Sequence, residues 1–371
     1  MTSTPRSALE TTAVEALKTV HDPLTGQDWV SGKQLKSLRV DEQGQATVEI
    51  ALGYPATSLW PAYTAQVSQA LLAVPGVAGV DVHWTTQIQT HATPKGQTPL
   101  PGVKNLIGIA SGKGGVGKST TAINLALALA AEGARVGMMD ADIYGPSQPL
   151  MMGLSGRPDS PDGKSIEPLR NHGLQMMSIG LLIDENAPTI WRGPMATQAV
   201  DQLLRQTRWG APDAPLDYLI IDMPPGTGDI HLTLCQRAPL TAAVIVTTPQ
   251  DIALLDARKG LKMFEKVGVP VLGVVENMAT YHCPNCGHEE HIFGADGGKR
   301  LAQETGVPVL GSMPLDLKIR EQADRGQPTL VADPHGRIAG LYKDIAQRLA
   351  AGLSRLPKDY SGKLPGVTVV S

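Results

Sequence analysis

The chain has 371 residues, of which 42% are hydrophobic and 18% charged, and its formal net charge is −3. At about 100–200 residues per domain, this length and apolar content predict a globular protein of two domains. The small negative charge excludes a global basic field, so composition gives no reason to expect a protein that binds nucleic acid or an anionic membrane.

The N-terminal residues and the cysteines indicate the compartment. The first residues, MTSTPRSALETTAVEAL, are polar and acidic where a secretory signal would be apolar, and the sequence has no run of about 18 apolar residues. There are three cysteines, Cys235, Cys283 and Cys286, and the last two are spaced C-x-x-C. We therefore expect a cytoplasmic protein whose cysteine pair serves metal or redox chemistry rather than a disulfide framework.

The pattern of polar and apolar residues over 1–90 predicts a small α/β domain. A helix pattern at Val14 and Leu17 ends at Asp22-Pro23, and polar and apolar residues alternate along two strands, 46–52 and 80–84. A second amphipathic helix lies between these strands and is closed by a Pro-Gly pair. Residues 91–103, HATPKGQTPLPGV, show neither the periodicity of a helix nor the alternation of a strand, and we predict that they form a linker.

Residues 104–351 alternate apolar strands with helices, and residues 352–371 are expected to form a loosely ordered tail. The strands are continuously apolar, which is typical of strands covered on both faces. We therefore predict a mostly parallel sheet with helices on both faces. The predicted strands are 106–110, 136–139, 218–221, 242–246, 271–275 and 307–310.

A glycine-rich loop follows the first of these strands and precedes a predicted helix over 122–131. This is the context that a G-x-x-x-x-G-K-[ST] phosphate-binding loop requires. Backbone N–H groups of such a loop converge on phosphate oxygens, the lysine reaches the β- and γ-phosphates, and the hydroxyl binds Mg²⁺. The residues predicted to bind ATP here are Gly112, Lys113, Gly114, Gly115, Val116, Gly117, Lys118, Ser119 and Thr120, with Ser119 on Mg²⁺.

The loop carries a second lysine, Lys113. A G-K-G-G-x-G-K-[ST] sequence resembles the deviant Walker A class, which includes partition ATPases, the nitrogenase iron protein and the arsenite-pump ATPase. The resemblance implies a homodimer in which Lys113 reaches the nucleotide of the partner subunit, so Lys113 and Lys118 are both expected to be catalytic.

Polar residues at the ends of later strands complete the predicted site. By resemblance to the same class, Asp142 positions the attacking water, and Asp140 supports either the loop or the metal shell. Asp222 is a Walker B candidate for Mg²⁺, and the N–H of Gly226, in P-P-G-T-G-D, could sense the γ-phosphate. Asn277 stands where related ATPases read the adenine edge with an amide.

The C-x-x-C pair supplies two thiolates, whereas a zinc ion or an iron–sulfur cluster normally takes four ligands. Three interpretations remain open from spacing. His282, His288 and His291 could complete a local zinc site with Cys283 and Cys286. Two copies of the pair facing each other across a dimer axis could hold a bridging [4Fe–4S] cluster. A dithiol redox pair is the third interpretation, although the helix context typical of such pairs is absent from the sequence.

Seven motifs occur in order: GKGGVGKST, DADIYGPSQP, WRGP, DMPPGTGDIHLTL, ENM, CPNCG and HIFGADGGKRLA. Together, over about Lys104–Leu349, they closely resemble the Mrp/Nbp35 family of ATPases, also called ApbC-like iron–sulfur cluster carriers. This resemblance implies a [4Fe–4S] cluster held between subunits by Cys283 and Cys286 of each chain. It further implies ATP-dependent delivery to apoproteins, together with cluster assembly factors as partners.

The N-terminal domain resembles the MIP18-like (DUF59) iron–sulfur assembly domain, including its Asp22-Pro23 turn. Many members of that group have a cysteine after the second strand, where this chain reads Gly-Tyr-Pro-Ala-Thr-Ser over 53–58. We therefore expect docking or protein recognition from this domain rather than direct cluster handling. Cys235, in a predicted helix, is expected to be a buried hydrophobic residue.

Two other functions compete with a carrier. A positioning ATPase of the partition or septum-site type, with a structural zinc at the C-x-x-C, would need a basic surface or a terminal amphipathic helix, and the tail has neither. An electron donor like the nitrogenase iron protein has cluster cysteines that are widely separated in sequence, whereas these two are adjacent. We expect neither nucleic acid nor membrane as a partner.

Overall fold

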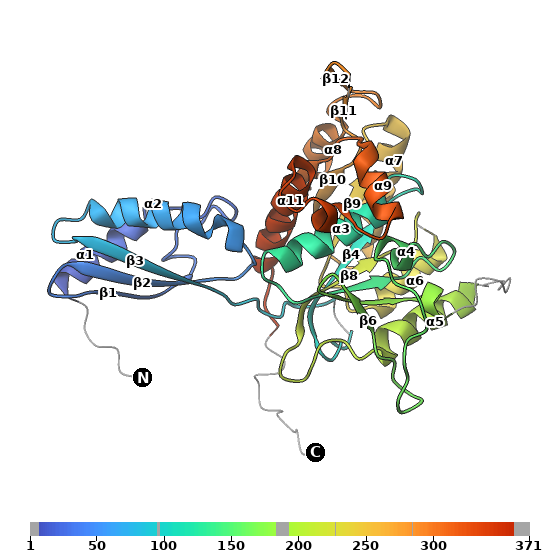
Figure 1. Ribbon diagram of the computed structural model, residues 1–371, viewed down its shortest axis with the longest axis horizontal. Helices are drawn as coiled ribbons and strands as arrows, with labels where there is room; N and C mark the ends of the chain where they lie inside the picture. Colours follow the sequence, from blue (N-terminus) through green and yellow to red (C-terminus); the bar gives the residue numbers. More distant parts are fainter. Residues whose placement is uncertain (1–6, 95–96, 183–192, 227, 284, 360–371) are drawn as a thin grey trace. The chain divides into compact units, whose positions relative to one another are not determined.

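The computed structural model describes residues 7–94, 97–182, 193–226, 228–283 and 285–359. It divides into two compact units, which we describe separately (Figure 1). The first comprises the residues up to Gln89 together with Ala350–Arg355, and the second comprises Thr90–Leu349 and the residues from Leu356.

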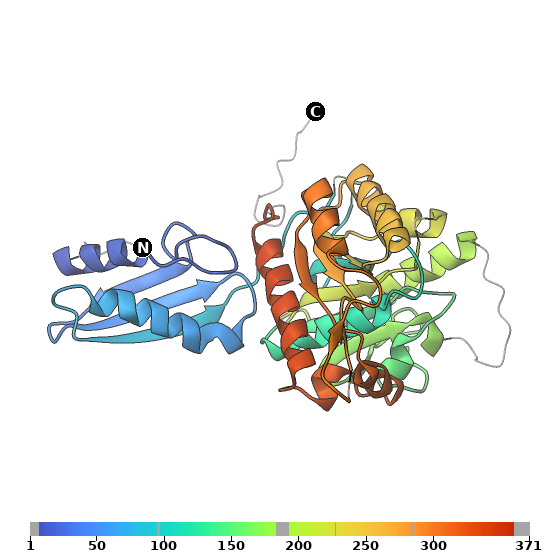
Figure 2. The ribbon, with the colours of Figure 1, turned by 90° about the horizontal axis from the view of Figure 1, so that it is seen from above.

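The first unit is a three-stranded sheet with two helices. Strand β2 pairs antiparallel with β1 and parallel with β3, and α2 makes the crossover between β2 and β3. Both helices lie on the same side of the sheet (Figure 2). As the alternation predicted, Val48 and Ile50 are buried while Asp81 and His83 are exposed. The elements are α1 (Ala8–Leu17), β1 (Leu35–Val40), β2 (Gln45–Leu52), η1 (Thr57–Leu59), α2 (Trp60–Leu72) and β3 (Gly79–Thr86).

A buried aspartate closes the first turn of this unit. The carboxylate of Asp22 accepts hydrogen bonds from the Tyr54 hydroxyl at 2.8 Å, the Thr25 hydroxyl at 2.7 Å and the backbone N–H of Leu24 at 2.9 Å. Because all three donors are buried or half-buried with it, the Asp22-Pro23 turn predicted from sequence is part of the core of the unit.

The second unit is built on an eight-stranded sheet in the order β13-β10-β9-β4-β8-β5-β7-β6, parallel except for the β6–β7 pair. Helices cover both of its faces (Figures 1 and 2), as predicted. Its strands are β4 (Val103–Ala110), β5 (Val136–Asp140), β6 (Leu169–Asn171), β7 (Leu174–Ser178), β8 (Leu216–Asp222), β9 (Ala242–Thr247), β10 (Val271–Glu276) and β13 (Val309–Ser312).

Most helices of this unit are amphipathic and bury their apolar residues against the sheet. The buried cluster on one face includes Leu204, Leu254 and Phe264, whereas α3 on the other face is buried nearly throughout. The helices are α3 (Lys118–Ala131), α4 (Gln148–Met151), η2 (Ile179–Leu181), α5 (Gly193–Gln206), α6 (Asp229–Arg237), α7 (Asp251–Lys266), α8 (Gly297–Thr305), α9 (Leu317–Asp324), α10 (Thr329–Ala332) and α11 (Arg337–Ser354). A small hairpin, β11 (Tyr281–His282) and β12 (Glu289–Glu290), follows β10.

The sequence-based prediction differs from this fold in three respects. Strands β1, β6, β7, β11 and β12 were not predicted; β1 is half-exposed, and β6, β11 and β12 are only two or three residues long. The strand predicted from Leu106 begins at Val103, inside the predicted linker. Residues 352–354, expected in a loose tail, continue α11 to Ser354.

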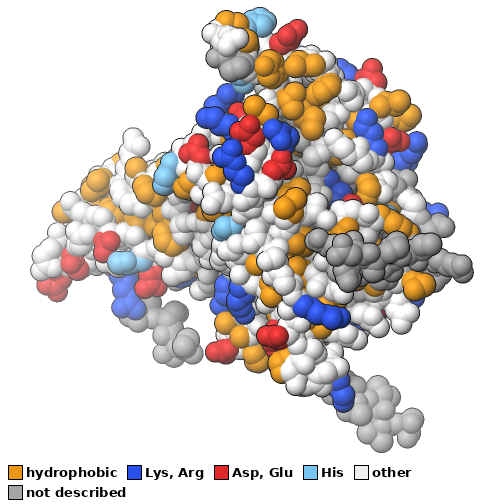
Figure 3. Space-filling view, turned by 45° about the vertical axis from the view of Figure 1, so that its right-hand side comes forward, with side chains coloured by type: hydrophobic (Ala, Val, Ile, Leu, Met, Phe, Trp, Pro, Cys, Tyr) orange, Lys and Arg blue, Asp and Glu red, His pale blue; other side chains and the backbone are white. Residues whose placement is uncertain are grey.

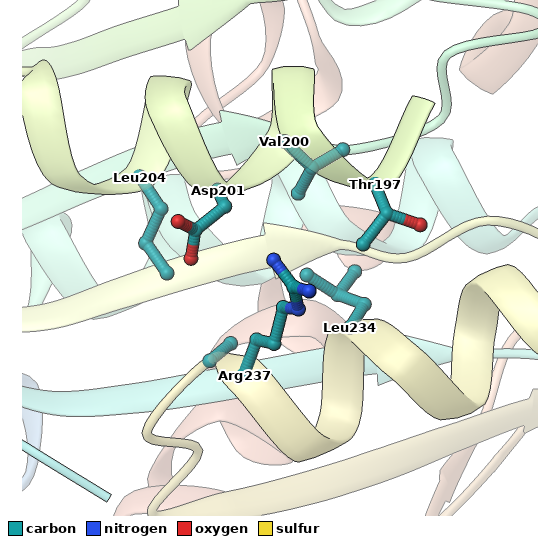
Figure 4. A pocket seen from close by; sticks show the side chains of 7 residues that line it. Thr197, Val200, Asp201, Leu204, Leu234 and Arg237 are labelled. Atoms are coloured by element: carbon teal, nitrogen blue, oxygen red, sulfur yellow. The ribbon is translucent and has the colours of Figure 1, made fainter. Parts of the chain in front are cut away.

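Helix α6 packs against α5, and Cys235 lies on α6. Figure 4 shows Val200 and Leu204 of α5 facing Leu234 and Arg237 of α6. Cys235 is fully buried, and burial raises the pKa of its thiol to about 12. It therefore behaves as the buried apolar residue predicted from the sequence.

The surface is of mixed charge. On the face drawn in Figure 3, Lys and Arg side chains are interspersed with Asp and Glu rather than gathered in one basic area. Among the helices that the structure describes, each is too short or too polar to cross a membrane.

Candidate functional site: a nucleotide loop and a cysteine hairpin

The phosphate-binding loop connects the end of β4 to the start of α3. Gly115 and Gly117 adopt φ angles of 80° and 83°, in the left-handed region that glycine tolerates best. Gly117 immediately precedes the first residue of α3, so the backbone N–H groups of the first helical turn face the loop. A helix N-terminus of this kind is suited to bind an anion.

Lys118 lies at the centre of the site. Its side chain is only 6% exposed and forms an ion pair with Asp222. Its Nζ atom is also 3.7 Å from Oδ2 of Asp142 and 3.2 Å from Oγ of Ser119. Residues predicted from three separate motifs, Lys118 with Ser119, Asp142 and Asp222, therefore lie in contact with the same ammonium group.

Sheet register explains why these carboxylates meet. Asp140 of β5 and Asp222 of β8 are paired residues at the carboxyl ends of neighbouring parallel strands. Burial, and next the negative charge of Asp222, raise the pKa of Asp140. Burial also raises the pKa of Asp142, against the opposing charge of Lys118. The site therefore concentrates acidic groups where a cation would stabilise them.

Asp140 organises the loop that follows β5. Its carboxylate accepts hydrogen bonds from the backbone N–H groups of Asp142 at 3.1 Å, Ser147 at 3.0 Å and Gln148 at 3.1 Å. The Ser178 hydroxyl adds a fourth bond at 3.2 Å. Of the two roles considered for Asp140, this arrangement favours support of the loop.

The residues near Asp222 fit a Mg²⁺ ion. The ion prefers oxygen ligands and keeps part of its hydration shell. The Ser119 hydroxyl and the Asp222 carboxylate are such ligands. The amide of Gln148, fully buried beside them, donates to Ser119 O at 3.0 Å and to Asp222 Oδ2 at 2.9 Å. Sequence reasoning did not single out Gln148, because the sequence around this glutamine does not indicate that it contacts Ser119 and Asp222, which are distant in the chain.

The P-P-G-T-G-D segment that contains Gly226 follows β8, and its backbone is described except for Thr227. The N–H of Gly226, predicted to sense the γ-phosphate, donates to the carbonyl of Ser111 at 3.0 Å, which links this segment to the phosphate-binding loop. His231 follows on α6, is 2% exposed, and packs edge-on against Phe264 with a ring-centroid distance of 5.6 Å. The sequence motif DMPPGTGDIHLTL includes His231, but sequence reasoning gave this residue no role. Trp191 and Arg192 of the WRGP motif lie outside the described residues.

Asn277 and Lys113 each make a side-chain contact that involves the phosphate-binding loop. The side-chain amide of Asn277 donates to the carbonyl of Val116 at 2.9 Å, and so fixes the loop to the end of β10. This contact is an additional role, and adenine recognition by Asn277 stays a prediction. Lys113 is half-exposed, and its Nζ atom is 3.5 Å from Oε1 of Gln250.

Cys283 and Cys286 lie in the turn between β11 and β12. The backbone N–H of Cys283 donates to His288 O and that of Gly287 donates to Cys283 O, both at 2.9 Å. Backbone N–H groups of Cys286 and Asn285, with the Cys286 thiol, lower the pKa of Cys283. The lowered pKa favours the thiolate, which is the form of cysteine that binds metal, and metal binding by this pair stays a prediction.

The local zinc site considered from spacing is not supported. His282 Nε2 lies 3.2 Å from Glu289 and 3.0 Å from Arg337, and His291 Nδ1 lies 2.9 Å from the carbonyl of Ala279. Among the described residues there is no group of three or more His, Cys, Asp and Glu side chains arranged to hold a metal ion. A metal centre that takes four ligands would therefore need two ligands besides Cys283 and Cys286.

The fold, the loop and the acidic residues around Lys118 define the chain as a P-loop NTPase. The family model for NUBPL iron-transfer P-loop NTPases, a ParA group, matches residues 102–350, and a model for iron–sulfur cluster assembly proteins matches residues 10–83. The chain belongs to the family of NUBPL iron-transfer P-loop NTPases. These matches confirm the resemblance found for both parts of the sequence.

Relatives are similar over most of the chain. The "Iron-sulfur cluster carrier protein" of Salmonella typhimurium is 52% identical over 307 residues, 82% of each chain. The "Iron-sulfur cluster transfer protein NUBPL" of Mus musculus is 52% identical over 275 residues, 74% of this chain and 85% of the relative. A nucleotide-binding protein from Archaeoglobus fulgidus, solved with ADP, superposes with a TM-score of 0.55 at 34% identity, over 65% of this chain and 93% of that one.

Proposed function

We propose that this protein is an ATP-hydrolysing iron–sulfur cluster carrier that holds a [4Fe–4S] cluster between two copies of the chain and transfers it to apoproteins. The observation that carries the proposal is the cysteine hairpin. It presents a half-exposed and an exposed thiol, the first with a lowered pKa, on a chain whose other site is a P-loop. The names of the relatives support the same function.

Two copies supply the ligands that one chain lacks. One C-x-x-C pair gives two thiolates, and a two-fold axis through the cluster would present the same pair from both subunits. Lys113 supports this arrangement, because its side chain is half-exposed on the loop. Among the described residues its ammonium group has one weak contact, at 3.5 Å to Gln250, which it could give up to bind the nucleotide of a partner subunit. The exposed apolar side chains of Ile252 and Leu255 lie on the neighbouring α7 and would be covered in such a dimer.

ATP binding changes the partners of Lys118. Its ammonium group pairs with Asp222, and in the ATP complex it would turn to the β- and γ-phosphates. Ser119 and Asp222 would then hold Mg²⁺, which supplies positive charge to the phosphates. Asp142, whose pKa is raised by burial, is placed to orient water and to accept its proton. Hydrolysis can alter delivery only if the two nucleotide states differ in cluster affinity.

The partners follow from this role. The cargo would pass between assembly factors and apo iron–sulfur proteins, and the first unit would serve their recognition. We place the activity in the cytoplasm, where a reducing environment keeps Cys283 and Cys286 as thiols. The mixed charge of the face in Figure 3 supports the expectation that neither nucleic acid nor membrane is a partner.

Anaerobic purification tests the proposal. We expect iron and sulfide at about four of each per dimer, as one [4Fe–4S] cluster requires, and their loss in Cys283→Ala and Cys286→Ala. Cys235→Ala is the matched control, since Cys235 is buried and should leave the iron content unchanged. Stoichiometric zinc without iron, even after reconstitution with iron and sulfide, would contradict the carrier and favour a positioning ATPase with a structural zinc.

A further inference from the structure

Gln148, the first residue of α4, is buried between the predicted Mg²⁺ ligands. Its side chain is fully buried, and its backbone N–H is held by Asp140 at 3.1 Å. The side-chain amide therefore approaches Ser119 and Asp222 from a loop that is itself fixed to the sheet.

The orientation of this amide follows from its neighbours. Its terminal nitrogen lies 3.0 Å from the carbonyl of Ser119 and 2.9 Å from the carboxylate of Asp222. Both neighbours are acceptors, so the atom between them must be the NH₂ group, and both of its hydrogens are used. The other terminal atom, Oε1, is consequently an acceptor.

Oε1 of Gln148 is buried and has no hydrogen-bond partner among the described residues. A buried acceptor left unpaired costs about 1–3 kcal/mol, so such an atom beside a ligand site indicates a donor that binds with the ligand. Mg²⁺ supplies such a donor, because it keeps several hydration waters when it binds nucleotide.

Gln148 also complements Lys118. One carboxylate oxygen of Asp222 pairs with Lys118 and the other accepts from Gln148. When Lys118 turns to the phosphates, Gln148 still holds Asp222 in place. We propose that Gln148 is a positioning residue of the Mg²⁺ site, which fixes Asp222 and Ser119 and offers Oε1 to a hydration water of the ion. The inference rests on the proposed binding of Mg²⁺ and ATP.

The test measures binding without turnover. A fluorescent ADP analogue is titrated against the full chain in EDTA and at increasing Mg²⁺. Gln148→Met removes the donors and the acceptor at similar length, and should raise the half-saturating Mg²⁺ concentration by roughly tenfold while affinity in EDTA stays unchanged. Gln175→Met is the matched control. Gln175 is a buried glutamine of β7, and its Oε1 accepts a hydrogen bond from the backbone N–H of Gly210, outside this network.

A second variant keeps the inference testable if Gln148→Met does not fold. Gln148→Glu retains an oxygen acceptor but loses both donors and sets a second carboxylate against Asp222, so it should also raise the half-saturating Mg²⁺ concentration. A purely structural role would lower the melting temperature of both variants without moving this concentration. Unchanged Mg²⁺ dependence in a folded Gln148→Met, or in Gln148→Glu, overturns the inference. Wild-type protein that binds no nucleotide would instead overturn the proposed function, and this inference with it.

Discussion

Single residues in the nucleotide site are linked by charge. Lys118 contacts two carboxylates that belong to different sequence motifs, those of Asp142 and Asp222, and the Asp222 carboxylate also accepts a hydrogen bond from Gln148. A substitution at one position therefore changes the electrostatic environment of the others. His231 shows the same effect at a residue that makes no contact with the carboxylates.

His231 predicts an acid-sensitive stability. Burial, and next the positive charge of Lys118, outweigh the nearby carbonyls of Gly226 and Pro224 and lower the pKa of His231 from 6.5 to about 4. Between these values the unfolded chain binds more protons, so stability falls as pH drops from about 6.5 towards 4, by up to roughly 3 kcal/mol.

Calorimetry of wild type and His231→Leu across this pH range measures the contribution. The difference between the two proteins isolates His231 from the other titrating groups. We expect a shallower acid dependence in the variant, and an identical dependence in both proteins would contradict the assigned pKa.

At the scale of elements, the loop is held by its close approach to α7. A Cβ atom added to Gly112 would lie 2.3 Å from the backbone carbonyl carbon of Asp256 and 2.4 Å from its oxygen. Backbone cannot move aside as a flexible side chain can, so the loop would have to shift. Gly114, two residues later, has open space around the same position.

Gly112→Ala should therefore destabilise the ATPase unit by about 1–3 kcal/mol, as overpacking does. In calorimetry this lowers the melting temperature of the transition that nucleotide shifts, by about 2–4 °C per kcal/mol. Gly114→Ala serves as the control and should melt close to wild type. Equal melting temperatures for Gly112→Ala and wild type would show that the loop does not need this contact.

At the scale of the whole molecule, Lys113 predicts assembly controlled by nucleotide. Within the part of the chain that the structure describes, its side chain makes one weak contact, to Gln250, so Lys113→Ala should melt like wild type. We expect the variant to bind ATP as a monomer where the wild type dimerises, as measured by analytical ultracentrifugation with and without ATP. Lys18→Ala, which removes an exposed lysine paired with Glu15 in the first unit, is the control. ATP-dependent dimers of Lys113→Ala would refute this role.

Coupling between the two sites is tested by Lys118→Ala. Removing this charge should reduce ATP hydrolysis by about a hundredfold or more and reduce maturation of iron–sulfur enzymes in cells. The purified variant should still acquire a cluster, because Cys283 and Cys286 are unchanged. Undiminished maturation with hydrolysis abolished would mean that delivery does not depend on turnover.

The sequence by itself determined the class of the sheet, the phosphate-binding loop, the cysteine turn and the family. These depend on local order: continuous apolar strands, glycines at strained positions and motifs of fixed spacing. Short or half-exposed strands such as β1 and β6 were not predicted from the sequence, because their residues show only a weak alternation of polar and apolar side chains. In the phosphate-binding loop itself, the sequence identified Lys118 and Ser119 as site residues but did not predict which other side chains they contact.

Only the tertiary structure decided which side chains share the site. Register between β5 and β8 pairs Asp140 with Asp222, and the loop after β5 carries Gln148 to the same point. It also gave His282 and His291, which spacing alone had allowed as zinc ligands, other partners in Glu289 and the carbonyl of Ala279. These distances depend on how strands align and loops fold back, and residues far apart in sequence carry no local signal of them.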